Sequence, residues 1–402
     1  MKKQNLRTPD GVRDIYDMEC RRKMVLQQKL HQVLHSYGYH DIQTPSFEFF
    51  HIFGNDIGTT PSKDLYKFFD KEGNTLALRP DFTPSIARSA ATYYMEEDMP
   101  VKLCYIGNTF VNSSDYQGRL KENTQCGAEL IGDGTVAADA EILAMAVSCL
   151  EQAGLRHFQI SVGHARYFQA LAEAAGLDED MTDNLQRLIL NKNFLGLEDL
   201  IRDTDLPEEL KQLFYLLGKF NTTAEDLRQA CLLAADYPQI LTSLQELQEL
   251  GDFLSYYGIE KYISFELGII SRFTYYTGII FSGYTFGTGQ PVISGGRYDR
   301  LLSYFGKDAP AIGFAVVVDQ LQAALTRQKI TIPVSEQSAL IVYQPACARD
   351  AVRRSILLRS KGIHTELLMM TEGRSKDDYA HYAVSHHIQK VEFFENERQE
   401  AR

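Results

Sequence analysis

The chain has 402 residues, of which 44% are apolar and 23% charged, a composition typical of a soluble globular protein with room for two or three domains. Its formal net charge of −12 weighs against tRNA as the main ligand, because proteins that bind nucleic acid usually present a basic face to phosphate. No apolar run approaches the roughly 20 residues of a membrane helix, no secretory signal opens the chain, and the six cysteines form no CxxC pair, so we expect a cytoplasmic protein without a zinc module.

The first half of the chain alternates helix and strand signals. Residues 18–37 have the spacing of an amphipathic helix, with Leu26, Leu30 and Leu34 on one face and Gly38 where the helix should end. Thr44-Pro45 marks an extended segment. Further elements are expected as strands at 75–78, 102–111 and 124–131, a helix at 137–153, and an alternating strand at 157–163.

The character of the sequence changes at about residue 165. Leu, Gln, Glu and Ala dominate as far as 258, which predicts a helical insertion, and strand signals return from 262 to 320. Strands on both sides of a helical block predict one α+β domain over residues 1–325, with an antiparallel sheet and flanking helices. Residues 326–337 are predicted to be a linker, and residues 338–402 a small α/β unit.

Several segments resemble the histidyl-tRNA synthetase family, whose members have the class II aminoacyl-tRNA synthetase fold. The family's TPxGxRD start, motif 1, LRPEGT, YYTG, GGRYD and motif 3 entry occur here in the family's order, over roughly residues 7–325 and more weakly near the C-terminus. The matching stretches are Thr8–Asp14, Tyr37–Pro45, Leu78–Thr83, Tyr275–Gly278, Gly295–Asp299 and Pro310–Ala315. The resemblance implies the class II fold, self-association through motif 1, and a C-terminal unit that is a truncated relative of the anticodon-binding domain.

Three positions depart from the synthetases. Where that family has the ATP-binding arginine of motif 2, the arginine of motif 3 and the histidine-specific arginine, this chain has Val111, Gln320 and Ser271. Arg272 lies one residue from the last position, but on a strand it would point to the opposite face. A guanidinium suits the phosphate charge that grows as an adenylate forms, and each lost donor costs roughly 3–4 kcal/mol. We therefore expect no catalysis by this chain and no cofactor.

The amino-acid pocket is better kept. The resemblance places histidine-binding groups at six positions with carboxylate, hydroxyl, amide and aromatic side chains, suited to an α-ammonium and an imidazole. These positions are Asp81, Thr83, Gln125, Glu129, Tyr275 and Tyr276. Asp81 replaces a glutamate and shortens the reach by one methylene. Two interpretations stay open: a working pocket for histidine or another effector, and a hydrogen-bonded scaffold without a ligand.

Other motifs receive structural interpretations. His31 and His35 have a spacing that can bind metal, but the sequence offers no obvious third ligand, so we expect solvated or capping histidines and no metal site. His381, His386 and His387 are expected at the surface. The segment 283–289 is rich in glycine but lacks the lysine and the strand–helix setting of a phosphate loop, so it predicts a hairpin turn.

A chain that keeps the pocket and loses the arginines resembles the ATP phosphoribosyltransferase regulatory subunit family. The resemblance implies a non-catalytic subunit that a short-form catalytic ATP phosphoribosyltransferase requires for activity, at the first step of histidine biosynthesis. It also implies a hetero-octamer and feedback by L-histidine, which would bind one quaternary state better than another. Two alternatives remain: an active histidyl-tRNA synthetase, and a tRNA-binding or amino-acid-sensing module outside this pathway.

Overall fold

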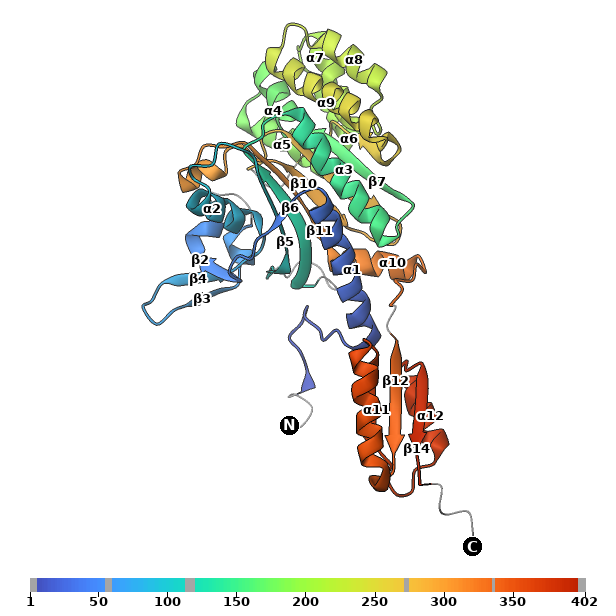
Figure 1. The fold of residues 1–402 in the computed structure, drawn as a ribbon. Helices are drawn as coiled ribbons and strands as arrows, with labels where there is room; N and C mark the ends of the chain where they lie inside the picture. Colours follow the sequence, from blue (N-terminus) through green and yellow to red (C-terminus); the bar gives the residue numbers. More distant parts are fainter. Residues whose placement is uncertain (1–5, 55–59, 113–119, 271–274, 335–336, 397–402) are drawn as a thin grey trace. The chain divides into compact units, whose positions relative to one another are not determined.

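The computed structural model describes residues 6–54, 60–112, 120–270, 275–334 and 337–396 (Figure 1). The chain divides into two compact units, Met1–Ile332 and Pro333–Arg402, which are considered separately below. Within the described ranges, no helix combines the length and the apolar composition needed to cross a membrane.

An eight-stranded sheet forms the centre of the first unit, in the order β1-β5-β6-β11-β10-β9-β7-β8. Its strands are β1 (His40–Asp41), β5 (Val101–Phe110), β6 (Glu122–Ile131), β7 (Phe158–His164), β8 (Ile263–Phe265), β9 (Ile279–Thr285), β10 (Ile293–Arg297) and β11 (Ala311–Val317). The predicted α+β class is confirmed. The sheet is antiparallel in its middle, as predicted, and at its two edges β1 pairs with β5 and β8 with β7 in parallel.

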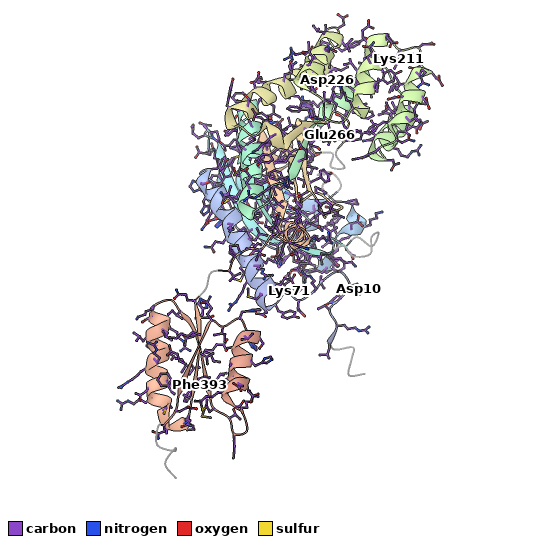
Figure 2. All side chains as sticks on the ribbon, turned by 90° about the vertical axis from the view of Figure 1, so that its right-hand side faces the viewer. Asp10, Lys71, Lys211, Asp226, Glu266 and Phe393 are labelled. Atoms are coloured by element: carbon purple, nitrogen blue, oxygen red, sulfur yellow. The ribbon has the colours of Figure 1, made fainter. Side chains whose placement is uncertain are left out.

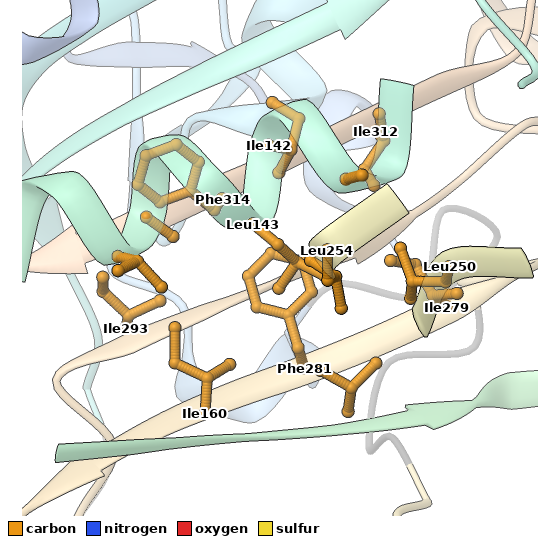
Figure 3. Close-up of a cluster of buried hydrophobic side chains, with 14 of the residues drawn as sticks. Ile142, Leu143, Ile160, Leu250, Leu254, Ile279, Phe281, Ile293, Ile312 and Phe314 are labelled. Atoms are coloured by element: carbon orange, nitrogen blue, oxygen red, sulfur yellow. The ribbon is translucent and has the colours of Figure 1, made fainter. Parts of the chain in front are cut away.

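Two long helices cover one face of this sheet. They are α1 (Asp17–Ser36) and α3 (Val136–Ala153), and the leucines predicted to face the core on α1 are buried. In Figure 3, Leu143 of α3 lies against Phe281 and Phe314 from the strands, in the main apolar core of the unit. Thr135 caps α3 by accepting a hydrogen bond from the N–H of Ala138, and Gly154 ends it in the left-handed region at φ 103°. Burial of this face leaves the other face of the sheet for the site.

The predicted helical insertion follows β7. It comprises α4 (Ala165–Ala174), α5 (Glu179–Leu190), α6 (Phe194–Arg202), α7 (Glu208–Tyr215), α8 (Ala224–Leu233) and α9 (Pro238–Tyr257). Helix α9 packs against α4 and α8 within the insertion and against α3 outside it, so the insertion rests on the helix that covers the sheet (Figure 1). Helix α10 (Val318–Arg327) follows β11 and packs against α1.

A smaller sheet and one helix complete the first unit. The antiparallel strands β2 (Phe47–Phe49), β3 (Lys67–Phe69) and β4 (Thr75–Leu78) have the order β2-β4-β3. Helix α2 (Thr83–Tyr93) follows β4 directly, and Pro84 occupies its first turn, where the missing N–H has no helical partner to lose. This connection brings the segment Asp81–Thr83 to the open face of the large sheet.

The second unit is a small α/β fold. Its three parallel strands have the order β13-β12-β14 and comprise β12 (Ser338–Tyr343), β13 (His364–Met369) and β14 (Lys390–Phe394), with helices α11 (Ala348–Ser360) and α12 (Lys376–Ser385). Phe393, labelled in Figure 2, packs with Leu340 and Val342 on one face of the sheet. Ala351 and Leu358 of α11 cover the other face with Ile341.

Candidate ligand-binding site

The candidate site lies on the sheet face opposite α1 and α3. Side chains alternate along β6, so Cys126, Ala128 and Leu130 enter the main core, while Gln125 and Glu129 face the other way. Leu103 and Tyr105 of the neighbouring β5 pack in a second, smaller core on this face, with Phe82, which directly precedes α2, and Ile86 of α2. The site is therefore built on the paired strands β5 and β6, with α2 beside them.

Glu129 is the centre of the site. Its side chain is 1% exposed, and its two carboxylate oxygens accept hydrogen bonds from the Thr83 hydroxyl at 2.9 Å and the Tyr298 hydroxyl at 2.5 Å. The pKa of Glu129 is raised to about 8, mainly by burial. The nearby charge of Asp81 also raises it, and the two hydrogen bonds lower it. The neutral and charged forms of Glu129 are therefore equally populated at about pH 8.

Asp81 is the second carboxyl group of the site. It accepts a hydrogen bond from the backbone N–H of Phe82 at 2.8 Å, which fixes it at the entry to α2. Burial raises the pKa of Asp81 above its ordinary value, although hydrogen bonds from Phe82 and Thr83 work in the opposite direction. Two acids close together, Glu129 buried and Asp81 half-buried, favour a cationic or hydrogen-bond-donating ligand.

Three tyrosines form an aromatic wall. The rings of Tyr275 and Tyr276 lie 4.5 Å apart, and the ring of Tyr298 meets Tyr275 edge-on at 6.0 Å. The charges of Asp81 and Glu129 contribute to the high pKa of both Tyr275 and Tyr276, after the larger effect of burial. Asp81, Thr83, Glu129, Tyr275 and Tyr276 are therefore brought together in space, as a shared pocket requires.

Two polar atoms of the site lack protein partners. Among the described residues, the Tyr105 hydroxyl and the Oε1 atom of Gln125 are buried without a hydrogen bond. Tyr105 is paired across the strands with Gly127, two residues after Gln125, so both groups face the same side of the sheet. A buried polar atom without a partner costs about 1–3 kcal/mol, and a ligand that bonded to these atoms would recover part of that cost.

Glycines create the space for these side chains. A Cβ atom on Gly313 would lie 1.6 Å from a carboxylate oxygen of Glu129, and one on Gly127 would lie 2.5 Å from the Tyr105 hydroxyl. A Cβ atom on Gly296, in the GGRYD segment, would lie 2.8 Å from the ring of Tyr276. The side chains of the site therefore pack directly against the sheet backbone, at positions where any added side chain would collide with them.

A cavity of about 690 Å³ adjoins the aromatic wall. Of the six residues predicted to bind the ligand, all of which are described, only Tyr275 and Tyr276 line this cavity. The rest of its lining comes from the end of β7, from α4 and α9, and from the segments before β9 and after β10: His164, Arg166, Gln169, Ala170, Glu173, Gln239, Thr242, Ser243, Glu246, Thr277, Arg300, Leu301 and Tyr304. Tyr275 and Tyr276 thus belong both to the candidate pocket and to a polar cavity beside the helical insertion.

The positions where the resemblance to the synthetases led us to look for arginines carry no cationic side chain where the structure describes them. Val111 follows β5, and its N–H donates to the carbonyl of Lys121 at 2.9 Å, while Gln320 lies half-buried on α10. The adjacent Asp319 accepts hydrogen bonds from the Lys23 ammonium and the Thr124 N–H, both at 2.6 Å. Ser271 and Arg272 lie outside the described residues.

The arginine of the GGRYD segment has a structural role. The guanidinium of Arg297 contacts a carboxylate oxygen of Asp139 at 2.5 and 2.9 Å and also bonds to the carbonyls of Asp133 and Thr135. Its bonding capacity is used within the fold. The glycine-rich segment 283–289 ends strand β9 and enters the hairpin connection to the antiparallel strand β10, in agreement with the predicted hairpin.

Sequence reasoning missed three features. Tyr298 could have been singled out because it belongs to the GGRYD segment, directly after Arg297, but nothing in the sequence indicated its hydrogen bond to Glu129. Tyr105 stands in a strand with no motif. The sequence offers no obvious third ligand beside His31 and His35, whereas the fold places Asp41 and Cys104 next to them.

Comparison with known proteins places this geometry in a family. The family model described as histidyl-tRNA synthetase matches residues 11–321. An ATP phosphoribosyltransferase regulatory subunit of Acetivibrio thermocellus is 36% identical over 363 residues, covering 90% of this chain and 86% of the relative. The chain belongs to the ATP phosphoribosyltransferase regulatory subunit family.

Other members of this family and its synthetase neighbours agree. The regulatory subunit of Ruminiclostridium cellulolyticum is 35% identical, covering 96% of this chain and 92% of the relative. A crystal structure from Bacillus halodurans, described as an ATP phosphoribosyltransferase regulatory subunit/histidyl-tRNA synthetase, has a TM-score of 0.85 and 30% identity, covering 97% and 99% of the two chains. A histidyl-tRNA synthetase structure from Nostoc is 19% identical with a TM-score of 0.79, covering 97% and 92%, and supports the shared fold alone.

Proposed function

We propose that this chain is a non-catalytic regulatory subunit that a short-form ATP phosphoribosyltransferase requires for activity, in the first step of histidine biosynthesis. One contrast within the site carries the proposal. Val111 and Gln320 offer no positive charge where a synthetase needs it, whereas Asp81, Thr83 and Glu129 are assembled as an amino-acid pocket requires. The names of the relatives support the same role.

Reconstitution tests this proposal. The purified chain is mixed with a short-form catalytic subunit, and phosphoribosyl transfer to ATP is measured with each protein alone and with both. We expect transfer only with both proteins, and no histidine-dependent ATP–pyrophosphate exchange by the chain alone, because three lost phosphate donors remove the charge that adenylate formation needs. Clear ATP–pyrophosphate exchange would favour the alternative of an active histidyl-tRNA synthetase. Equal phosphoribosyl transfer with and without the chain would contradict the proposal.

We propose further that the pocket binds L-histidine as a feedback effector. Glu129 and Asp81 would receive the α-ammonium and an imidazole N–H, Gln125 and Tyr105 would supply the unpaired polar atoms, and the tyrosines a flat wall. An effector changes the assembly only through its differential affinity for two states, so the pocket must differ between them. The scaffold alternative predicts no binding at this position.

Histidine binding through Glu129 should tighten as the pH rises toward about 8. Burial keeps Glu129 protonated below this pKa, while a bound cation or N–H favours the carboxylate, so binding at lower pH releases a proton and affinity rises by up to about tenfold per pH unit. Calorimetry at neutral pH in buffers of different ionisation enthalpy measures that proton. Glu129→Gln should weaken binding and release none, whereas Glu141→Gln, outside the pocket, should behave like the wild type. Equal proton release by Glu129→Gln would exclude this role for Glu129.

The assembly is proposed on the same basis. Four copies of this chain and four catalytic subunits would form a hetero-octamer in the cytoplasm, with self-association through the segment 37–45, and native mass spectrometry of the mixture tests that stoichiometry. We propose that residues 326–337 link the domain 1–325 to the unit 338–402, and that this last unit is a truncated form of the synthetase anticodon-binding domain. All six cysteines are free, which is compatible with a reducing compartment.

A further inference from the structure

Four side chains with metal-binding atoms meet at one edge of the large sheet. His31 and His35 come from α1, Asp41 from the edge strand β1, and Cys104 from β5. One ligand atom from each residue lies within 4.8 Å of all the others. None of these residues belongs to the pocket around Glu129, so the proposed function does not account for the cluster.

The fold determines this meeting in two independent ways. His31 and His35 are four residues apart on α1, so their rings lie on the same face of the helix, with centroids 4.1 Å apart. Asp41 and Cys104 are direct partners in the parallel pairing of β1 with β5, so their side chains project to the same side of the sheet. Gly38, at φ 83°, makes the turn that carries the chain from α1 into β1.

Contacts within the cluster converge on one carboxylate. The Nε2 atom of His31 is hydrogen-bonded to Oδ1 of Asp41, and Nε2 of His35 lies 3.0 Å from its Oδ2. The Cys104 thiol donates to Oδ1 at 3.6 Å. All four residues therefore already point their ligand atoms inward, toward a common centre, and small side-chain rotations would bring them to the spacing of a tetrahedral shell.

The burial of the cluster is graded. Cys104 is fully buried, while the side chains of His31, His35 and Asp41 are 31%, 45% and 59% exposed. An ion could therefore enter from solvent along the histidine side and meet the thiol at the back. Two imidazole nitrogens, one carboxylate oxygen and one thiolate sulfur form a ligand set typical of Zn²⁺, while Mg²⁺ and Ca²⁺ prefer shells of oxygen.

We propose that His31, His35, Asp41 and Cys104 form a binding site for a divalent transition metal of the Zn²⁺ type. Binding forms a bond from the Cys104 sulfur to the metal and breaks the S–H bond, and the proton passes to solvent. The ion replaces the hydrogen bonds within the cluster and ties α1 to the edge strand β1 and to β5. Because the metal binds the folded chain, it stabilises the fold.

Cobalt(II) is the probe for this site. The full-length chain, freed of metal with a chelator, is titrated with Co²⁺ and followed by absorption. We expect one equivalent to bind, with a thiolate-to-cobalt charge-transfer band and the intense visible bands of a tetrahedral site, and Zn²⁺ to displace it. Cys104→Ser should abolish the charge-transfer band, and His35→Ala should abolish tight binding.

Matched controls separate this site from adventitious binding. His40→Ala changes an exposed histidine next to Asp41 that lies outside the cluster, and Cys347→Ser removes a thiol in the other unit, so both variants should keep the cobalt spectrum. Because Cys104→Ser alters a buried residue, thermal unfolding in chelator checks that each variant folds. In addition, Zn²⁺ should raise the Tm of the wild type by several degrees and leave His31→Ala/His35→Ala unchanged.

The opposite results would overturn the proposal. They are a titration without a saturable band, a charge-transfer band that survives Cys104→Ser in a folded protein, and an equal Tm shift in the wild type and the double histidine variant. Any of them would leave the cluster as a set of hydrogen bonds that positions α1 on the sheet. None of these outcomes bears on phosphoribosyl transfer, so the test is independent of the proposed function.

Discussion

Replacing Arg297 with methionine is expected to lower the free energy of unfolding by about 3–5 kcal/mol. Arg297 and Asp139 are 6% and 4% exposed, and two nitrogens of the guanidinium contact one oxygen of the carboxylate. Methionine retains much of the volume but leaves Asp139 as a buried acid without its partner. The carbonyls of Asp133 and Thr135 also lose their donors.

Urea denaturation followed by far-UV circular dichroism measures this effect. Arg228→Met is the matched control, because Arg228 pairs with Glu225 on the surface of α8, where such pairs contribute about 0.5 kcal/mol or less. The double variant Arg297→Met/Asp139→Asn should recover part of the loss, since both charges are then removed. A loss below about 1 kcal/mol for Arg297→Met would show that Asp139 finds solvent or another partner.

The second large effect is a dependence of stability on pH that originates in Glu129. Its folded pKa, about 8, lies above the ordinary value of 4.5, because burial disfavours the charge. The unfolded chain therefore ionises this group first as the pH rises, and the folded state loses stability between about pH 4.5 and 8, with no further loss above. The shift corresponds to roughly 4–5 kcal/mol.

Glu129→Gln removes this dependence because glutamine cannot ionise. We expect the free energy of unfolding of the variant, relative to the wild type, to increase by about 3–5 kcal/mol from pH 5 to pH 9. Chemical denaturation at a series of pH values provides both curves. Glu260→Gln, at an exposed position, should run parallel to the wild type. Parallel curves for Glu129→Gln as well would mean that the folded state relaxes to hydrate this carboxylate.

Elements with strong local signals were predictable from the sequence. Helix α1 has leucines at helical spacing and a glycine just beyond its end, and α3 has the same features. In both helices the apolar spacing and the terminal glycine therefore predict the same helix and the same end point. The parallel pairings of β1 and β8 were not predictable. These strands have only two and three residues, so their own composition carries little information about their partners. A parallel pairing depends on the long segment that connects the two strands.

The candidate site shows the same division. Six pocket positions were predicted through motifs, and four of them (Asp81, Thr83, Tyr275 and Tyr276) lie around a fifth, Glu129. The bond from Tyr298 to Glu129, however, joins residues 169 apart in the chain. Likewise, nothing near His31 in the sequence indicates Cys104, because the register of β1 against β5 makes that contact. Residue type and local spacing predict which chemistry is present, while strand register decides which groups meet.

The glycines of the pocket face restrict how this protein can evolve. At Gly127, Gly296 and Gly313, atoms of Tyr105, Tyr276 and Glu129 and of the neighbouring backbone lie where a Cβ atom would stand. Any substitution at these positions would therefore displace a side chain of the site or the backbone beside it, so these positions are closed to gradual adjustment of ligand size. A lineage that needed a different ligand would have to change the surrounding tyrosines and carboxylates instead.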